Sequence, residues 1–169
     1  MNNPLKKSDI HTVSLLVANK PGVLVRVAQV FARRGFNIDS LVVSASVNPK
    51  FSRMTITAQG DRGTLDQIIK QTSKLIDVIH SSEHTGKDSL TKEFALLKVK
   101  YTSGNKNSLV KLIKKFHASV EDDSKNTLII GQTGTTYELD ELESLLKEYG
   151  IIEMVRSGKL VMAIGREAT

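Results

Sequence analysis

The chain contains no cysteine and no tryptophan, and only 3 of its 169 residues are proline. The absence of cysteine excludes disulfide scaffolds, thiolate metal sites and cysteine nucleophiles, and it suits a reducing compartment. No apolar run approaches the roughly 18 residues that a membrane-spanning helix needs, and the first ten residues are too polar for a secretory signal. We therefore expect a cytoplasmic protein with no membrane partner.

Aromatic residues are also scarce, at 5% of the chain, whereas lysine and arginine outnumber aspartate and glutamate by 24 to 18. A basic balance raises the possibility of a nucleic-acid partner. However, nucleic-acid binding on the face of a sheet needs exposed aromatic residues for base stacking, and residues 53–56 supply none. We expect no nucleic-acid partner, and a basic nucleic-acid-binding module stays the less favoured alternative.

Hydrophobic periodicity predicts the same element order twice. In the first half, period-2 strands alternate with helices whose apolar residues recur at i, i+3, i+4 and i+7. The expected strands are residues 12–18, 36–47, 54–58 and 76–84, with helices after Pro21 and after Gly63. The second half repeats the order, with strands at 94–101, 118–122, 127–130, 151–156 and 160–164. The sequence thus predicts an α+β protein with two ferredoxin-like βαββαβ domains in tandem.

The predicted boundaries follow the breaks in this pattern. Residues 1–10 are expected to be a flexible N-terminus, 11–85 the first domain, 86–91 a linker and 92–169 the second domain. Both helices of a ferredoxin-like domain pack on one sheet face, yet residues 36–47 are apolar nearly throughout and predict a buried strand. A partner subunit would cover the free face, so we expect a homodimer or a larger assembly.

Sequence patterns typical of catalysis are missing. The chain has no nucleophile elbow, dinucleotide fingerprint or Walker loop, and His80 and His84 would lie about 13 Å apart on a straight strand, too far to share a metal. Asp122 and Asp123 would point to opposite faces of an extended chain, so a turn suits them better than acid–base chemistry. We expect no catalytic residue and no metal site.

The strongest candidate site is the loop between the first strand and the first helix. Gly22 lets a ligand approach the backbone, and the N–H groups of Val23, Leu24 and Val25 begin the helix, where a carboxylate would bind. Amide groups at Asn19 and Asn37 could meet a carboxylate and an ammonium group. This combination suits a zwitterionic amino acid, although a plain helix cap with a turn asparagine fits the same residues.

A resemblance favours the ligand site. Residues 19–27 (NKPGVLVRV), 34–41 (RGFNIDSL) and 52–56 (SRMTI), with Asn48-Pro49 and Gly60-Asp61, closely resemble the N-terminal ACT domain of the small, regulatory subunit of acetohydroxyacid synthase (acetolactate synthase). Residues 93–99 (EFALLKV), 133–134, 149–151 and 156–159 resemble the C-terminal domain of that family. The second half departs from the family pattern at Lys92, at Asp123, near Gly131 and in residues 164–166.

This resemblance implies a non-catalytic subunit that binds and activates the catalytic (large) subunit and confers feedback inhibition by valine or another branched-chain amino acid. Thiamine diphosphate, Mg²⁺ and FAD would belong to the catalytic subunit, and this chain would hold no cofactor. The effector would lie between two ACT domains, on Asn19, the backbone of residues 22–25 and Asn37, with Leu24 and Ile38 lining an apolar pocket. An ACT-type amino-acid sensor for a different enzyme remains an alternative.

Overall fold

The computed structural model describes residues 10–84, 89–166 and 169. The predicted flexible segment therefore lies outside the described residues except for Ile10, and so does half of the predicted linker, residues 86–88. The chain divides into two compact units, Met1–Thr91 with Lys159–Thr169, and Lys92–Gly158. No helix in the described part of the chain is long and apolar enough to cross a membrane.

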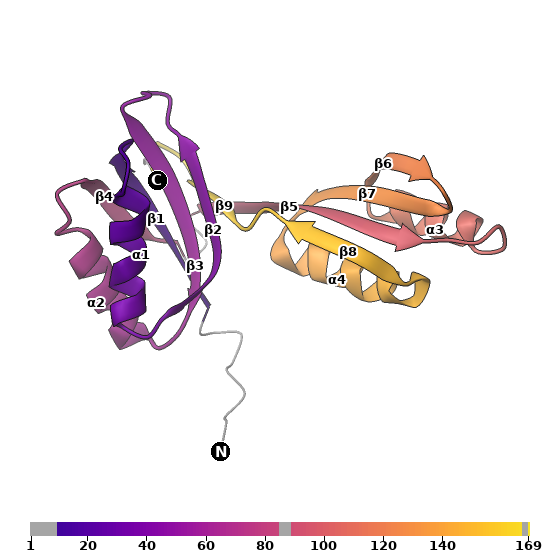
Figure 1. Ribbon diagram of the computed structural model, residues 1–169, viewed down its shortest axis with the longest axis horizontal. Coiled ribbons are helices and arrows are strands. Elements are labelled where there is room, and N and C mark those ends of the chain that lie inside the picture. Colours follow the sequence, from indigo (N-terminus) through magenta and orange to yellow (C-terminus); the bar gives the residue numbers. More distant parts are fainter. Residues whose placement is uncertain (1–9, 85–88, 167–168) are drawn as a thin grey trace, which may run out of the picture. The chain divides into compact units, whose positions relative to one another are not determined.

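The first unit is a four-stranded antiparallel sheet with two helices on one face (Figure 1). The strands lie in the order β2-β3-β1-β4, so β2 and β4 are its edges. Its elements are β1 (Ile10–Ala18), α1 (Val23–Arg33), β2 (Asn37–Ala45), β3 (Phe51–Gln59), α2 (Arg62–Thr72) and β4 (Val78–Glu83).

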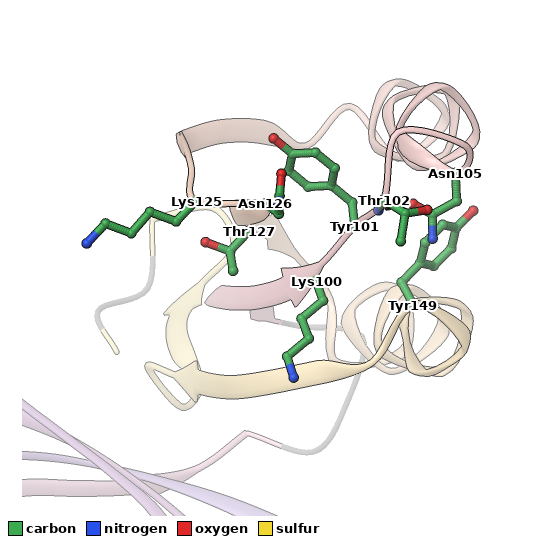
Figure 2. Close-up of a pocket in the computed structure, with 8 residues that line it drawn as sticks. All are labelled: Lys100, Tyr101, Thr102, Asn105, Lys125, Asn126, Thr127 and Tyr149. Carbon is green, nitrogen blue, oxygen red and sulfur yellow. Dashed lines mark hydrogen bonds between the residues drawn. The ribbon is translucent and has the colours of Figure 1, made fainter.

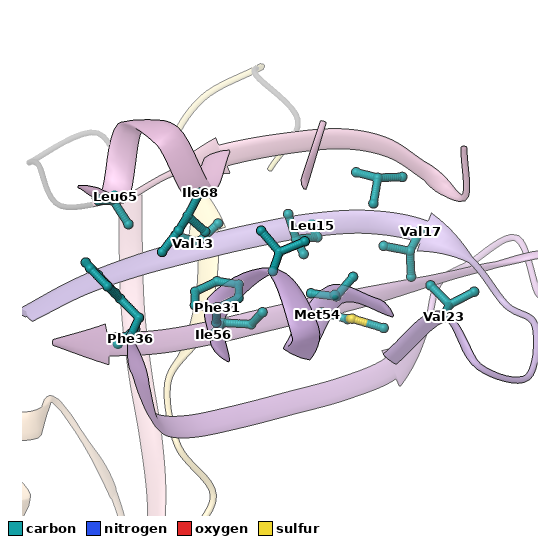
Figure 3. Packing of buried hydrophobic residues seen from close by; sticks show 14 residues of the cluster. Val13, Leu15, Val17, Val23, Phe31, Phe36, Met54, Ile56, Leu65 and Ile68 are labelled. Atoms are coloured by element: carbon teal, nitrogen blue, oxygen red, sulfur yellow. The ribbon is translucent and has the colours of Figure 1, made fainter. Parts of the chain in front are cut away.

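The core of this unit fills the space between the sheet and the helices (Figure 3). Alternate residues of β1, namely Val13, Leu15 and Val17, point to the helices and are at most 1% exposed. Phe31 of α1 and Ile56 of β3 meet them there and are fully buried. The period-2 and period-3.6 patterns of the sequence therefore converge on one apolar layer.

The second unit repeats this arrangement with the strand order β6-β7-β5-β8, and β9 pairs with β5 outside that path. Its helices also cover one face of the sheet (Figure 1). The elements are β5 (Ser89–Lys100), α3 (Lys106–Lys115), β6 (Ser119–Ser124), β7 (Thr127–Gly134), α4 (Thr136–Leu146), the 3-10 turn η2 (Lys147–Tyr149) and β8 (Ile151–Arg156). The strand β9 (Leu160–Ala163) belongs to the segment that groups with the first unit. The predicted tandem of two ferredoxin-like units is confirmed.

The C-terminal segment differs from the prediction, which assigned residues 92–169 to one domain. Gly158 has a left-handed φ of 79° after β8, and residues 159–169 group with the first unit. There the Arg53 guanidinium donates to the Thr169 carbonyl, and the Thr169 hydroxyl accepts from the Ala163 N–H at 2.7 Å. The β5 strand also begins at Ser89, inside the segment expected to be a linker.

Two expectations about the first sheet need correction. The strand predicted as buried is the edge strand β2, and none of its residues is fully buried. The face opposite the helices is not left entirely to a partner, because Ser14 and Thr55 on that face are 3% and 9% exposed within one chain. The C-terminal contact of Arg53, which lies on the same face, shows that the chain supplies part of this cover.

Candidate functional site

The candidate site begins where α1 starts without a side-chain cap. Gly22 is the N-cap residue, with φ 83°, and no side chain bonds to the first turn. The Val23 N–H reaches the Lys20 carbonyl at 3.4 Å, and the Arg26 N–H reaches the Gly22 carbonyl at 3.1 Å. No group in the described residues accepts from the N–H of Leu24 or Val25, so two donors and the positive helix end are available to an anion.

Gly22 is required at this position by both its conformation and its surroundings. A φ of 83° lies in the left-handed region, which side chains with a Cβ rarely adopt. A Cβ at residue 22 would also lie 3.2 Å from Nη1 of Arg26. That arginine forms an ion pair with Asp77 at 2.6 Å, so it joins the first turn of α1 to the segment before β4.

Asn19 holds the loop to the β2–β3 hairpin. Its backbone N–H donates to the Lys50 carbonyl at 2.8 Å, and its side-chain Nδ2 donates to the Pro49 carbonyl at 3.0 Å. The Oδ1 atom of Asn19 has no donor in the described residues. Asn19 therefore fixes the loop and still offers one acceptor.

A hollow of about 560 Å³ opens beside this loop. Three segments converge there because the antiparallel pairing brings the end of β1, the β2–β3 hairpin and the start of β4 to the same end of the sheet. Of the predicted site residues, only Asn19 lines it. The full lining is Ala18, Asn19, Lys20, Lys50, Phe51, Ile76, Asp77 and Ile79.

Sequence reasoning missed most of this lining. Ile76 and Ile79 are 94% and 57% exposed, which is unusual for aliphatic side chains beside a hollow. They were assigned to a strand, and nothing in their local pattern distinguishes them from core residues. The predicted topology itself could have found them, because it already brings the start of β4 to the end of β1.

The remaining predicted residues do not all come together in one chain. Val23 is buried in the core, so it can offer only its backbone, whereas Leu24 and Val25 are exposed. Asn37 and Ile38 lie at the opposite end of the sheet, because Asn37 pairs with Gln59 while Ala18 pairs with Phe51. Eight residue steps along β3 separate the two ends by roughly 27 Å.

Asn37 is exposed, and its Nδ2 donates to Oδ1 of Asp39 at 3.1 Å. Its own Oδ1 accepts from no group in the described part of the chain. Ile38 is half-buried and packs against the core. Within one chain, this end of β2 therefore presents an amide oxygen and a carboxylate next to an apolar side chain, which suits an ammonium group.

The other helix of the unit begins differently. Asp61 is the N-cap of α2, and its Oδ1 accepts from the Thr64 N–H at 2.9 Å. The hydrogen bonds from Thr64 hold the pKa of Asp61 below its ordinary value. The described residues contain no group of three or more side chains arranged to bind a metal ion, and His84 instead bonds through Nε2 to the Ser14 hydroxyl at 2.8 Å.

The chain has two ferredoxin-like units, and in the first unit the first helix begins after Gly22 without a side-chain cap. These features define a two-domain protein of the ACT type. Comparisons agree: residues 13–80 match the family model described as the AHAS small subunit-like ACT domain, and residues 92–166 match the small subunit of acetolactate synthase. The chain belongs to the family of acetolactate synthase small subunits, which are regulatory subunits.

Relatives support this assignment over nearly the whole length. The chain is 41% identical to the probable acetolactate synthase small subunit of Archaeoglobus fulgidus, over 93% of this chain and 98% of that one. It is 42% identical to the small subunit of Mycolicibacterium smegmatis, over 92% and 91%. The crystal structure of the Thermotoga maritima small subunit matches with a TM-score of 0.84 and 36% identity, covering 94% of this chain and 99% of that chain.

Proposed function

We propose that this chain activates the catalytic subunit of acetolactate synthase and makes it sensitive to feedback inhibition by valine or another branched-chain amino acid. The observation that carries the proposal is the open start of α1, where Leu24 and Val25 present unpaired N–H groups above a left-handed glycine. Thiamine diphosphate, Mg²⁺ and FAD would be held by the catalytic subunit, so this chain would act by binding and not by chemistry.

The effector site would be completed by a second copy of the chain. As an edge strand, β2 has an unpaired side, and antiparallel strands can extend a sheet across a two-fold axis. Pairing centred on Leu41 would set Asn37 of the partner subunit opposite Ala45. Ala45 pairs with Ser52, close to the hairpin that holds Asn19, so the two ends of the candidate site would meet between subunits.

The chemistry of the two ends is complementary to an amino acid. The N–H groups of Leu24 and Val25 would bind the carboxylate, while the amide oxygen of the partner's Asn37 would accept from the ammonium group. The partner's Ile38 and the exposed Leu24 would contact a branched aliphatic side chain. Feedback inhibition needs a coupling of only about 1–3 kcal/mol between the effector and catalytic sites.

The substitution Asn37→Asp tests this site. It replaces the Nδ2 donor to Asp39 by a carboxylate oxygen, so the two carboxylates repel each other and the acceptor for the ammonium group is displaced. We therefore expect the calorimetric titration of the full-length protein with valine, leucine and isoleucine to lose its saturable heat. In the reconstituted enzyme, inhibition should fade while activation persists. Asn107→Asp is the matched control, because it makes the same charge change on an exposed residue of α3.

Unchanged valine sensitivity in Asn37→Asp would rule out the proposed site. If the isolated wild-type chain binds none of the three amino acids, the same titration on the complex with the catalytic subunit decides between two cases. Binding to the complex alone would mean that the partner completes the site. No binding there would mean a subunit that only activates.

A further inference from the structure

The second unit has its own hollow, at the end of β5. Its volume is about 270 Å³, and Figure 2 shows the lining side chains arriving from three separate segments. The Lys100 N–H donates to the Gly150 carbonyl at 3.2 Å and the Tyr101 N–H to the Asn126 carbonyl at 3.0 Å, which ties these segments together. The lining is Lys100, Tyr101, Thr102, Asn105, Lys125, Asn126, Thr127 and Tyr149.

This hollow occupies the same place in its unit as the hollow beside Asn19 does in the first. Each lies where the loop after the first strand, the hairpin between the second and third strands and the start of the fourth strand meet. In the second unit these segments are the β5–α3 loop, the β6–β7 hairpin and the η2–β8 junction. The repeated fold therefore forms a concave corner twice.

The charges of the second hollow are not balanced. Lys100 and Lys125 are its only ionised lining residues, and neither has a carboxylate partner in the described part of the chain. The first hollow, in contrast, includes Asp77 among its lining residues. Two ammonium groups with no carboxylate among the lining residues favour an anion of more than one charge.

One wall of the hollow is held rigidly. The Tyr101 hydroxyl donates to Oδ1 of Asp123 at 2.6 Å, and the Lys106 ammonium donates to Oδ2 of the same carboxylate at 2.6 Å. The Lys106 Nζ also lies 4.7 Å from the centre of the Tyr101 ring. Because Asp123 is occupied by Lys106, it does not neutralise Lys100 or Lys125.

The position of Lys125 has a conformational cost. Lys125 and Asn126 form the two-residue turn between β6 and β7, with φ values of 53° and 61°. Turns with two left-handed residues favour asparagine, aspartate and glycine, so lysine at the first of these positions is disfavoured. Backbone strain of this kind clusters at ligand-binding and other functional sites, which agrees with a binding role for this ammonium group.

We propose that this hollow is a second ligand site, which binds a small phosphate-bearing molecule between Lys100 and Lys125. The side-chain N–H groups of Asn105 and Asn126 and the hydroxyl of Thr102 supply further donors for phosphate oxygens, whereas the Thr127 hydroxyl already donates to the Ser124 carbonyl. The volume is at the lower limit of ligand pockets, which excludes a large ligand or a partner helix. The site is independent of the effector site proposed for the first unit.

The test is a titration of the full-length chain with inorganic phosphate and with pyrophosphate at constant ionic strength, followed by ¹H–¹⁵N NMR. We expect saturable shifts of amides in the β5–α3 loop and the β6–β7 hairpin. The double substitution Lys100→Gln/Lys125→Gln should weaken binding by at least about tenfold, because charge-assisted hydrogen bonds are lost. Lys100→Arg/Lys125→Arg keeps both charges and should retain saturable binding.

The matched control is Lys111→Gln/Lys114→Gln, which removes two exposed lysines of α3 that do not line the hollow. Its affinity should equal that of the wild type. The proposal is overturned if neither probe gives saturable shifts, or if the control loses as much affinity as the hollow variant. Shifts that saturate only around α1 would also overturn it, since they would place the anion in the first unit.

Discussion

The two units share one strand order but differ in the chemistry of their equivalent corners. In the first, a left-handed glycine starts the helix, and the hollow carries the exposed aliphatic residues Ile76 and Ile79. In the second, the hollow carries two tyrosines and two lysines, and neither lysine has a carboxylate partner among the described residues. The fold therefore decides where a concave corner forms, and the residues placed there decide what it can bind.

Within each unit, the two helices also differ in how their N-termini are capped. Asp61 caps α2, and Thr135 with Glu138 forms a complete capping box at α4. The helices that follow the first strand of each unit, α1 and α3, begin without a side-chain cap. A cap contributes about 1 kcal/mol, so both units forgo this stabilisation at the helix that starts beside the hollow.

The largest expected effect concerns the separation of the two cores, which share no residue. Phe31→Ala in the first core should cost about 3–5 kcal/mol and Leu142→Ala in the second about 2–5 kcal/mol, because both side chains are fully buried. Hydrogen exchange followed by mass spectrometry should place each loss of protection in the unit that carries the substitution. Equal loss of protection in both units after either substitution would contradict two separate cores.

Substituting one glycine in each unit compares the two units again, with smaller expected changes in the free energy of unfolding. A Cβ on Gly60 would lie 2.3 Å from the Phe36 ring, inside the first core, so Gly60→Ala should destabilise the protein by about 1–3 kcal/mol. A Cβ on Gly131 would instead meet the Glu121 carboxylate at 2.6 Å and the Ser119 hydroxyl at 2.9 Å, and both belong to exposed side chains that can move. Gly131→Ala should therefore change the free energy of unfolding by less than about 0.5 kcal/mol. Urea denaturation of both variants measures the difference, and equal costs would contradict this account.

Much of the fold could be predicted from the sequence because its elements are amphipathic and its turns are marked. The alternation at Val13, Leu15 and Val17 and the stripe ending at Phe31 identify the core faces directly. The start of α1 could also be predicted, because Gly22 suits a left-handed position and Pro21 breaks the preceding strand. These signals are local, so no knowledge of distant contacts is needed.

The rest depends on distant pairing, which local patterns do not encode. The apolar residues of 36–47 predicted a buried strand, yet β2 lies at the edge of the sheet. The order of the strands, and not their apolar content, decides which strand is central. Asn37 and Gly22 were assigned to one site between two chains, and the strand register places them at opposite ends of the sheet within one chain, so no local pattern shows how two copies would bring them together. The hollow around Lys100 and Lys125 joins segments 25 positions apart, and nothing in either segment alone marks it.

The smallest expected effect separates the units by their response to pH. Hydrogen bonds from Lys106 and Tyr101 lower the pKa of Asp123, and the bond to Asp123 raises the pKa of Lys106. A lowered carboxyl pKa contributes stability that is present above the ordinary value of 3.8 and is lost as pH falls through the folded pKa. A raised lysine pKa contributes stability that is complete below 10.5 and is lost as pH rises through the folded pKa.

The second unit should therefore lose stability from this cluster at both ends of the pH scale, whereas Asp61 in the first unit contributes only at the acid end. Asp123→Asn removes the partner of Lys106, so the lysine pKa should fall toward its ordinary value and the alkaline loss of stability should become smaller. NMR titration of the Lys106 side chain, with Asp61→Asn as the control in the other unit, measures this shift. If Lys106 titrates identically in the wild type and in Asp123→Asn, the ion pair does not persist in solution and the wall of the second hollow is not rigid.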